Sequence, residues 1–204
     1  MYWYEDEVKR LEMQHTKLKY EAETLFYGSS SFRLWETLYE DFEVLKPVNL
    51  GFGGSTLAAC VWFFDRIMKP YHPKRMIIYA GDNDLGDGRH PEEVFIFFQQ
   101  LYEKVFTRFG DLHCYFLSLK PSLNRWHMMD QFRYTNNLIK ADIERHKSHW
   151  HFVDMFTPML DGEGKLKHEY FVSDGLHLSE HGYLLWKNVL NSQLSFELQS
   201  LVNR

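Results

Sequence analysis

The sequence predicts a three-layer α/β/α sandwich built around a five-stranded, mainly parallel sheet. Short apolar segments alternate with longer segments of helical spacing along almost the whole chain, and this alternation is typical of parallel sheets with crossover helices. Residues 75–80, RMIIYA, are apolar nearly throughout, as expected of a strand buried on both faces. Right-handed crossovers would place helices on both faces of the sheet. At 204 residues, 45% of them hydrophobic, the chain is expected to form a single domain over residues 1–204.

The first half of the chain is predicted to hold three strands and three helices. Tyr4, Val8, Leu11 and Leu18 recur at helical spacing, so residues 1–22 are expected to form a helical extension that packs on the domain. Each strand is a short apolar run that leads into a glycine-containing turn, and two prolines close the third helix. The predicted elements are helix 4–20, strand 23–27, helix 32–42, strand 46–50, helix 57–68 and strand 75–80.

The second half continues the alternation with two further strands. Pro91 suits the first turn of a helix, and Glu92 and Glu93 complement the helix dipole there. We find no internal repeat and no linker composition, which supports one continuous sheet. The predicted elements are loop 81–88, helix 91–108, strand 113–119, irregular segment 120–126, helix 128–147, strand 151–155, loop 159–166 and helix 181–201.

Composition and charge argue against several classes of function. The 23 basic and 28 acidic residues leave a net charge of −5, which disfavours a nucleic-acid surface or an anionic membrane partner. No apolar run reaches the ~18 residues of a membrane span, and charges stand where a signal peptide would be apolar, so we expect a soluble cytoplasmic protein. Cys60 and Cys114 lie in apolar surroundings, so we expect buried free thiols. The oligomeric state stays open.

Polar and glycine-rich segments follow the predicted strands, at the edge where parallel sheets bind ligands. Taken alone, each has an ordinary interpretation: Ser30 as a helix cap, residues 51–56 and 81–84 as turns, Asp174 and His177 as exposed polar groups. Together they supply a nucleophile, oxyanion donors, a base and a carboxylate three residues from it, which is the set that acyl transfer needs. The GxSxG elbow of α/β-hydrolases is absent from the sequence, so a different turn must present the serine.

Four blocks in matching order make the sequence similar to the SGNH hydrolases, also called GDSL-type esterases, over about residues 24–196. The resemblance implies a flavodoxin-like architecture, a Ser-His-Asp triad and no metal or organic cofactor. Ser29 and Ser55 replace aspartates that the family usually has, which concerns loop hydrogen bonding rather than the triad. The blocks are Phe26-Tyr27-Gly28-Ser29-Ser30-Ser31, residues 49–56, Gly81-Asp82-Asn83-Asp84 and Asp174-Gly175-Leu176-His177.

The resemblance also implies roles for single residues. Ser30 matches the nucleophile, and His177 and Asp174 match the other members of the triad. The backbone N–H groups of Ser30 and Gly54, with the side chain of Asn83, match the oxyanion hole. The implied activity is hydrolysis of small carboxylic esters through an acyl-enzyme, with carbohydrate acetyl esters as one substrate class. A lysophospholipase or thioesterase with the same triad is the alternative activity.

Aromatic side chains near the site loops suggest where a substrate would bind. Trp35, Trp126 and Phe171 are expected to line an acyl or sugar pocket, with core packing as the alternative. Two other functions stay open at this point. One is a non-catalytic binding domain on the same scaffold. The other is a metallophosphoesterase, for which Asp111 and His113 form the one Asp-x-His triplet, although the sequence has no HExxH motif.

Overall fold

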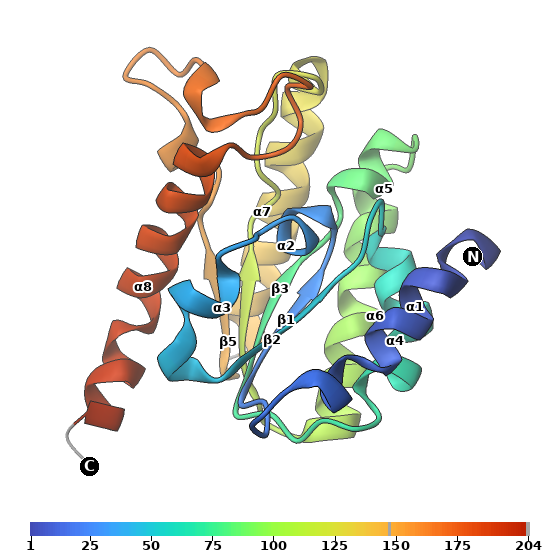
Figure 1. Ribbon diagram of the computed structural model, residues 1–204. Coiled ribbons are helices and arrows are strands. Elements are labelled where there is room, and N and C mark those ends of the chain that lie inside the picture. Colours follow the sequence, from blue (N-terminus) through green and yellow to red (C-terminus); the bar gives the residue numbers. More distant parts are fainter. Residues whose placement is uncertain (147, 203–204) are drawn as a thin grey trace.

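Five parallel strands form one sheet at the centre of the molecule (Figure 1). The structure is a computed structural model and describes residues 1–146 and 148–202. The strand order is β2-β1-β3-β4-β5. The first strand, β1, therefore lies inside the sheet, with β2 on one side of it and β3, β4 and β5 on the other. The strands are β1 (Thr24–Gly28), β2 (Pro47–Gly51), β3 (Arg75–Tyr79), β4 (His113–Leu117) and β5 (Trp150–Val153).

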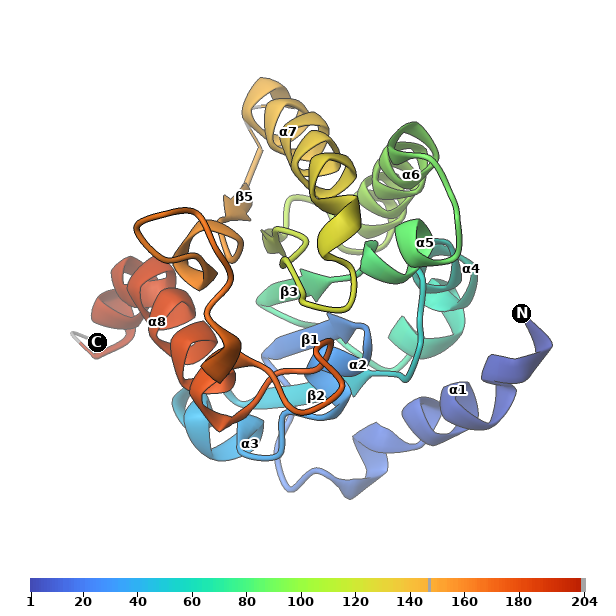
Figure 2. The ribbon, with the colours of Figure 1, turned by 90° about the horizontal axis from the view of Figure 1, so that it is seen from above.

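Helices cover both faces of the sheet, which confirms the predicted α/β/α class (Figure 2). The helices are α1 (Glu5–Glu12), α2 (Ser30–Arg33), α3 (Leu38–Asp41), α4 (Leu57–Met68), α5 (Asp82–Gly86), α6 (Pro91–Phe109), α7 (Met129–His146) and α8 (Glu180–Val202). Short 3-10 turns are η1 (Tyr2–Tyr4), η2 (Gln14–Lys17), η3 (Glu43–Leu45), η4 (Trp126–Met128), η5 (Thr157–Met159) and η6 (His168–Tyr170). The helices α1, α4, α6 and α7 pack on one face, and α2, α3 and α8 on the other. In the described ranges, no helix has both the length and the apolar character needed to cross a membrane.

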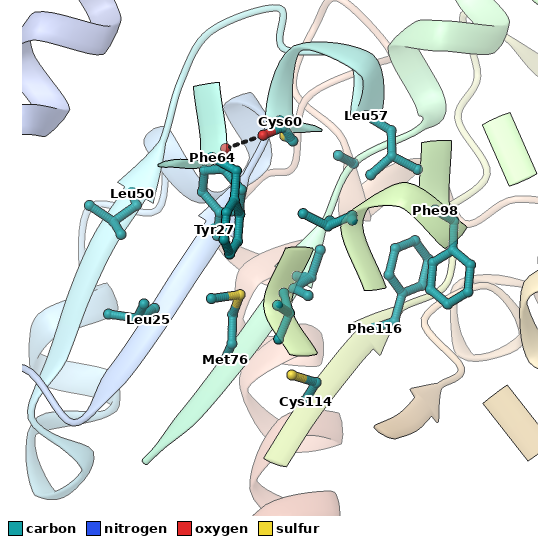
Figure 3. Packing of buried hydrophobic residues seen from close by; sticks show 14 of the residues in the cluster. Leu25, Tyr27, Leu50, Leu57, Cys60, Phe64, Met76, Phe98, Cys114 and Phe116 are labelled. Carbon is teal, nitrogen blue, oxygen red and sulfur yellow. Dashed lines mark hydrogen bonds between the residues drawn. The ribbon is translucent and has the colours of Figure 1, made fainter. Parts of the chain in front are cut away.

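Side chains alternate between the two faces along each strand. On β1, Leu25 and Tyr27 join the cluster under α4 and α6, whereas Phe26 joins the cluster under α8. Both clusters are apolar, which is why the strands are continuous apolar runs in the sequence. Figure 3 shows the first cluster, in which the Tyr27 hydroxyl donates to the Cys60 carbonyl at 2.7 Å. Cys60 and Cys114 are buried free thiols, as predicted.

The N-terminal helix is shorter than the predicted 4–20, because it ends at Glu12. Val8 and Leu11 are fully buried against α4, so the apolar face of this segment is complete within two turns. Beyond Glu12, the Thr16 hydroxyl donates to the carbonyl three residues earlier at 2.8 Å. Such local side-chain bonds compete with helix formation, and a 3-10 turn replaces the last part of the predicted helix.

Two other predicted segments also differ from the structure. The helix expected over 32–42 is interrupted, because Trp35 Nε1 and Thr37 Oγ1 donate to the Asp41 carboxylate at 2.8 and 2.6 Å instead of continuing one helix. The segment 81–88, expected as a loop, contains the short helix α5. Both differences lie next to the carboxyl edge of the sheet, where the chain must turn sharply after a strand.

Candidate active site

The turn after β1 presents Ser30 at the carboxyl edge of the sheet. Gly28 has φ of +146°, and a Cβ there would overlap the carbonyl oxygen of Tyr79 on the adjacent strand. Glycine is required at this point because it alone adopts this φ without a steric clash. The chain then passes through the buried Ser29 into α2, whose first residue is Ser30. Ser30 is half-buried, so its hydroxyl stands between the core and the solvent.

A chain of hydrogen bonds joins Ser30 to two residues near the other end of the sequence. Ser30 Oγ lies 3.1 Å from His177 Nε2, and His177 Nδ1 lies 2.6 Å from Asp174 Oδ2. Partial burial raises the pKa of Asp174, but hydrogen bonds from the His177 side chain and from the backbone N–H groups of His177 and Leu176 outweigh it and lower this pKa to about 2. Asp174 is therefore ionised at neutral pH and suited to hold a positively charged imidazole.

The loop that carries Asp174 and His177 is closed by its own hydrogen bonds. Asp174 Oδ1 accepts the backbone N–H groups of Leu176 at 2.8 Å and His177 at 2.9 Å, which is the usual pattern of an aspartate turn. Gly175 takes φ of +65° and donates its N–H to the Val172 carbonyl at 2.9 Å. Val172 in turn donates to the His177 carbonyl at 3.0 Å. The backbone thus aims the second carboxylate oxygen at the imidazole.

The strand order decides which loops flank the serine. β1 lies between β2 and β3, and Gly28 is paired with the last residue of each. The loop after β2, which carries Gly54, and the helix after β3, which carries Asn83, therefore lie on the two sides of the turn that presents Ser30. Backbone and amide N–H donors around a hydroxyl are the layout that an oxyanion hole requires.

Gly54 and Asn83 are each held by one further contact. Gly54 takes φ of +65°, and its carbonyl accepts the Tyr4 hydroxyl at 2.8 Å, so the N-terminal extension reaches the site. No described atom outside its own chain neighbours lies within 4 Å of the point a Cβ of Gly54 would occupy, so this position is open. Asn83 Nδ2 donates one N–H to the Ser55 carbonyl at 3.1 Å, which leaves its second N–H for a ligand.

Asp84 joins the segments that follow β2 and β3. Its fully buried carboxylate accepts the backbone N–H groups of Leu57 at 2.5 Å and Ala58 at 3.3 Å, at the start of α4. Burial raises the pKa of Asp84 to about 6, although these hydrogen bonds and the Arg89 guanidinium 3.4 Å away act to lower it. From sequence, this segment was expected to form only a local turn, because partners 26 and 27 residues away leave no signal in the local pattern.

Two cationic residues that the sequence analysis left without a role also contact the site loops. Lys120 Nζ donates to the Leu176 carbonyl at 2.7 Å, and Arg125 Nη2 donates to Asn83 Oδ1 at 2.9 Å. Both lie on the segment after β4, which was predicted only as irregular. The signal in the sequence was two cations within eight residues of the end of a buried strand, at the sheet edge that binds ligands.

Two of the three residues expected to line a pocket are buried in the core. Trp35 is 2% exposed, and its indole packs on Phe26 and Trp186, so the prediction of a substrate contact is wrong for this residue. Phe171 is 7% exposed and belongs to the same cluster, which leaves little of its ring for a ligand. Trp126 is 41% exposed, and its role stays a prediction. Aromatic residues near site loops do not reveal from sequence which way they point.

The residues considered for a metal lie at the opposite edge of the sheet. His113 is the first residue of β4 and Asp111 precedes it, whereas Ser30 follows the end of β1 in a parallel sheet. Asp111 Oδ2 lies 3.0 Å from His149 Nδ1 rather than near the segment 81–84. Within residues 1–146 and 148–202, no group of three or more His, Cys, Asp and Glu side chains is arranged to hold a metal ion.

A scan against protein families matches residues 24–185 to the GDSL-like Lipase/Acylhydrolase family. The chain belongs to this family. The match covers most of the chain, and it confirms the resemblance found in the four sequence blocks. As a member of the GDSL-like family, the protein is a hydrolase that acts on ester bonds. A comparison with curated proteins found no sequence match.

Solved structures with the same fold include other hydrolases. A protein from Streptococcus pneumonia, provisionally described as a platelet activating factor, is 22% identical with a TM-score of 0.82, over 93% of this chain and 92% of its own. A GDSL-like lipase from Bacteroides thetaiotaomicron is 20% identical with a TM-score of 0.74, over 95% and 98%. The Clostridium thermocellum family 3 carbohydrate esterase is 16% identical with a TM-score of 0.69, over 89% and 99%. At these identities the likeness concerns the fold.

Proposed function

We propose that this GDSL-like hydrolase is a serine esterase that cleaves small carboxylic esters through an acyl-enzyme intermediate. The observation that carries the proposal is the hydrogen-bonded series of Ser30 Oγ, His177 Nε2, His177 Nδ1 and Asp174 Oδ2, at 3.1 and 2.6 Å. A nucleophile, a base in contact with it and a carboxylate that orients the base have the geometry of an acyl-transfer triad.

In the proposed reaction, Ser30 Oγ bonds to the ester carbonyl carbon while His177 Nε2 takes the hydroxyl proton. The carbonyl oxygen becomes an oxyanion that the second N–H of Asn83 and the backbone N–H groups of Gly54 and Ser30 stabilise, each donor by about 3 kcal/mol. His177 then donates its proton to the departing alcohol. A water molecule attacks the acyl-enzyme by the same proton path, which releases the acid and restores Ser30. Asp174 holds Nδ1 protonated throughout.

A groove of about 470 Å³ lies between α2, α3 and the start of α8, and although no triad side chain lines it, we take it as the candidate substrate groove. Its lining includes Leu34, whose N–H donates to the Ser30 carbonyl, and Val172, whose N–H donates to the His177 carbonyl. The side chains of Leu34, Val172 and Leu184 are exposed in it. Apolar side chains in this groove would suit the acyl or alcohol part of a small ester.

The charges of the groove favour neutral substrates. Glu36 and Glu180 line it, and Lys187 is already paired with Asp41 at 2.7 Å. Acidic side chains repel acids, so esters of neutral acyl groups, including acetylated sugars, fit better than anionic ones. Exposed Trp126 remains a candidate for stacking on a sugar ring. Lysophospholipase or thioesterase activity is the alternative that a substrate series must separate.

The proposal is tested by labelling with a fluorophosphonate, which modifies an activated serine. We expect labelling of the native protein and loss of labelling in Ser30→Ala, whereas Ser29→Ala serves as the matched control and keeps it. Hydrolysis of p-nitrophenyl esters from acetate to decanoate, of a lysophospholipid and of an acyl thioester should show the highest kcat/KM for the short esters. An unlabelled native protein would overturn the proposed serine nucleophile, and labelling that persists in Ser30→Ala would place the nucleophile elsewhere.

A further inference from the structure

A buried lysine, Lys120, and a half-buried arginine, Arg125, lie beside the site without taking part in the proposed proton transfer. Lys120 is 2% exposed, and the side chain of Arg125 is 15% exposed. Burial lowers the pKa of Lys120 to about 8, although the Asp82 carboxylate acts to raise it. Burying an ammonium group costs free energy of folding unless other interactions compensate. Because burying Lys120 costs stability, we look for a functional role of this side chain.

Lys120 and its neighbours hold the loop that carries the base. Lys120 Nζ donates at 2.7 Å to the carbonyl of Leu176, the residue directly before His177. The N–H of Asn124 donates at 3.0 Å to the carbonyl of Gly175. A Cβ at Gly175 would come within 3.1 Å of Leu123, so the two segments touch closely. Two consecutive carbonyls of the loop are thus fixed by one segment.

Arg125 holds the amide on the other side of the nucleophile. Nη2 donates to Asn83 Oδ1 at 2.9 Å, and Nη1 donates to the Asp82 carbonyl at 2.9 Å. A guanidinium only donates, so it faces the oxygen of the amide and directs the NH₂ group of Asn83 away from itself. One N–H then reaches Ser55, and the other is the proposed oxyanion donor. Space for the guanidinium exists because residue 86 is glycine, whose Cβ would lie 2.6 Å from Nη2.

We propose that Lys120 and Arg125 are positioning residues of the esterase: Lys120 fixes the loop that carries His177, and Arg125 orients the Asn83 amide toward the oxyanion. This inference rests on the proposed function of Ser30, His177 and Asn83. The segment after β4 thereby connects the base to the oxyanion donor, which the sequence separates by 94 positions, 177 minus 83. The Asp82 carboxylate, 3.5 Å from Arg125 Nη1, offsets part of the positive charge.

Replacement of Lys120 by methionine separates positioning from a purely structural role. Methionine fills similar space without a buried charge, so Lys120→Met should keep or raise the melting temperature. Without the bond to the Leu176 carbonyl, the His177 loop is less well placed, and we expect kcat for p-nitrophenyl acetate to fall at least about tenfold with KM within about threefold. Lys140→Met, on the exposed surface of α7, is the matched control and should change neither value.

A double-mutant cycle tests Arg125. If Arg125 acts through Asn83, Arg125→Ala should lower kcat at least about tenfold in the native background but by less than about threefold when Asn83 is already alanine. Arg125→Lys should restore only part of the loss, because an ammonium group cannot contact both oxygens in the same fork geometry.

The result that would overturn the proposal for Lys120 is a Lys120→Met protein with native kcat, or one that fails to fold, since a structural role would then account for the residue. Equal losses from Arg125→Ala in both backgrounds would overturn the proposal for Arg125. Fluorophosphonate labelling of the native protein distinguishes a failure of the proposed function from a failure of the positioning role. If the native protein is not labelled, the proposed function fails; if it is labelled and the variants react at the native rate, only the positioning role fails.

Discussion

The substitution Asp174→Asn tests whether the Asp174 carboxylate determines which imidazole nitrogen of His177 carries the proton. In the native loop, Asp174 Oδ1 accepts two backbone N–H groups, from Leu176 and His177, while Oδ2 faces His177 Nδ1 at 2.6 Å. An asparagine keeps its one oxygen for the two backbone donors, so its NH₂ group must face Nδ1. Nδ1 then has to accept, and the imidazole proton moves to Nε2. An imidazole protonated at Nε2 cannot take the proton of Ser30.

The expected loss is large in turnover and small in stability. Holding the wrong tautomer in a serine triad lowers kcat by about 10⁴, or about 5.5 kcal/mol of transition-state stabilisation. The side chain of Asp174 is 48% exposed, and exposed ion pairs contribute under about 1 kcal/mol to folding, so the variant should fold normally. Because the pKa of Asp174 is about 2, the native carboxylate stays charged across the pH range of the assay.

The assay is the hydrolysis of p-nitrophenyl acetate, with kcat measured at saturating substrate and folding checked by thermal unfolding. Asp161→Asn is the matched control, since Asp161 Oδ1 also accepts two backbone N–H groups, from Glu163 and Lys165, in an exposed turn that makes no contact with the triad. We expect that control to keep native kcat. A kcat within about tenfold of the native value in Asp174→Asn would refute the tautomer argument.

Four further substitutions test other parts of the site. Asn83→Ala should lower kcat by about 10²–10³ with little change in KM, because an oxyanion donor bonds the transition state more strongly; a change confined to KM would contradict that role. Ser29→Ala should keep native kcat and unfold at equal or higher denaturant concentration, since the described part of the chain offers the buried Ser29 Oγ no hydrogen-bond partner. Gly28→Ala should lose about 3–5 kcal/mol in denaturant unfolding because of the overlap with the adjacent strand, and a loss under about 1 kcal/mol would show that the turn relaxes. For Asp84, the folded pKa of about 6 lies above the ordinary 3.8, so the native free energy of unfolding falls as the pH rises through this window. The free energy of unfolding of Asp84→Asn relative to native should therefore rise by about 2 kcal/mol from about pH 4 to about pH 7, and a flat difference would exclude the titration.

The strands and the longer helices could be predicted because their signals are local. The strand around residues 75–80 is apolar throughout since both of its faces are covered, and α4 covers the predicted residues 57–68. The segment 32–42 was harder, because its apolar spacing fits a helix although side-chain bonds to Asp41 interrupt it. The apolar spacing does not reveal whether this segment forms one continuous helix or is interrupted by side-chain hydrogen bonds.

The family and the candidate triad could be predicted from the order of the four motif blocks along the sequence. Ser30, Asp174 and His177 were predicted from sequence, and the structure places both Ser30 and Asp174 within hydrogen-bonding distance of His177. Their catalytic roles stay predictions, as does the cytoplasmic location. Trp35 was predicted to line a pocket but lies in the core, because residue type and proximity in sequence do not determine which way a side chain points.

The sequence by itself determined the fold class and the family, because apolar periodicity and short motifs are encoded in neighbouring residues. Only the tertiary structure decided that the loops with Gly54 and Asn83 flank Ser30, since strand order depends on which strands pair across the sheet. It also decided that Lys120 and Arg125 contact the site: their bonds reach partners 56 and 42 positions away. A lysine after a strand is solvated in most proteins, and only packing against distant segments removes it from water.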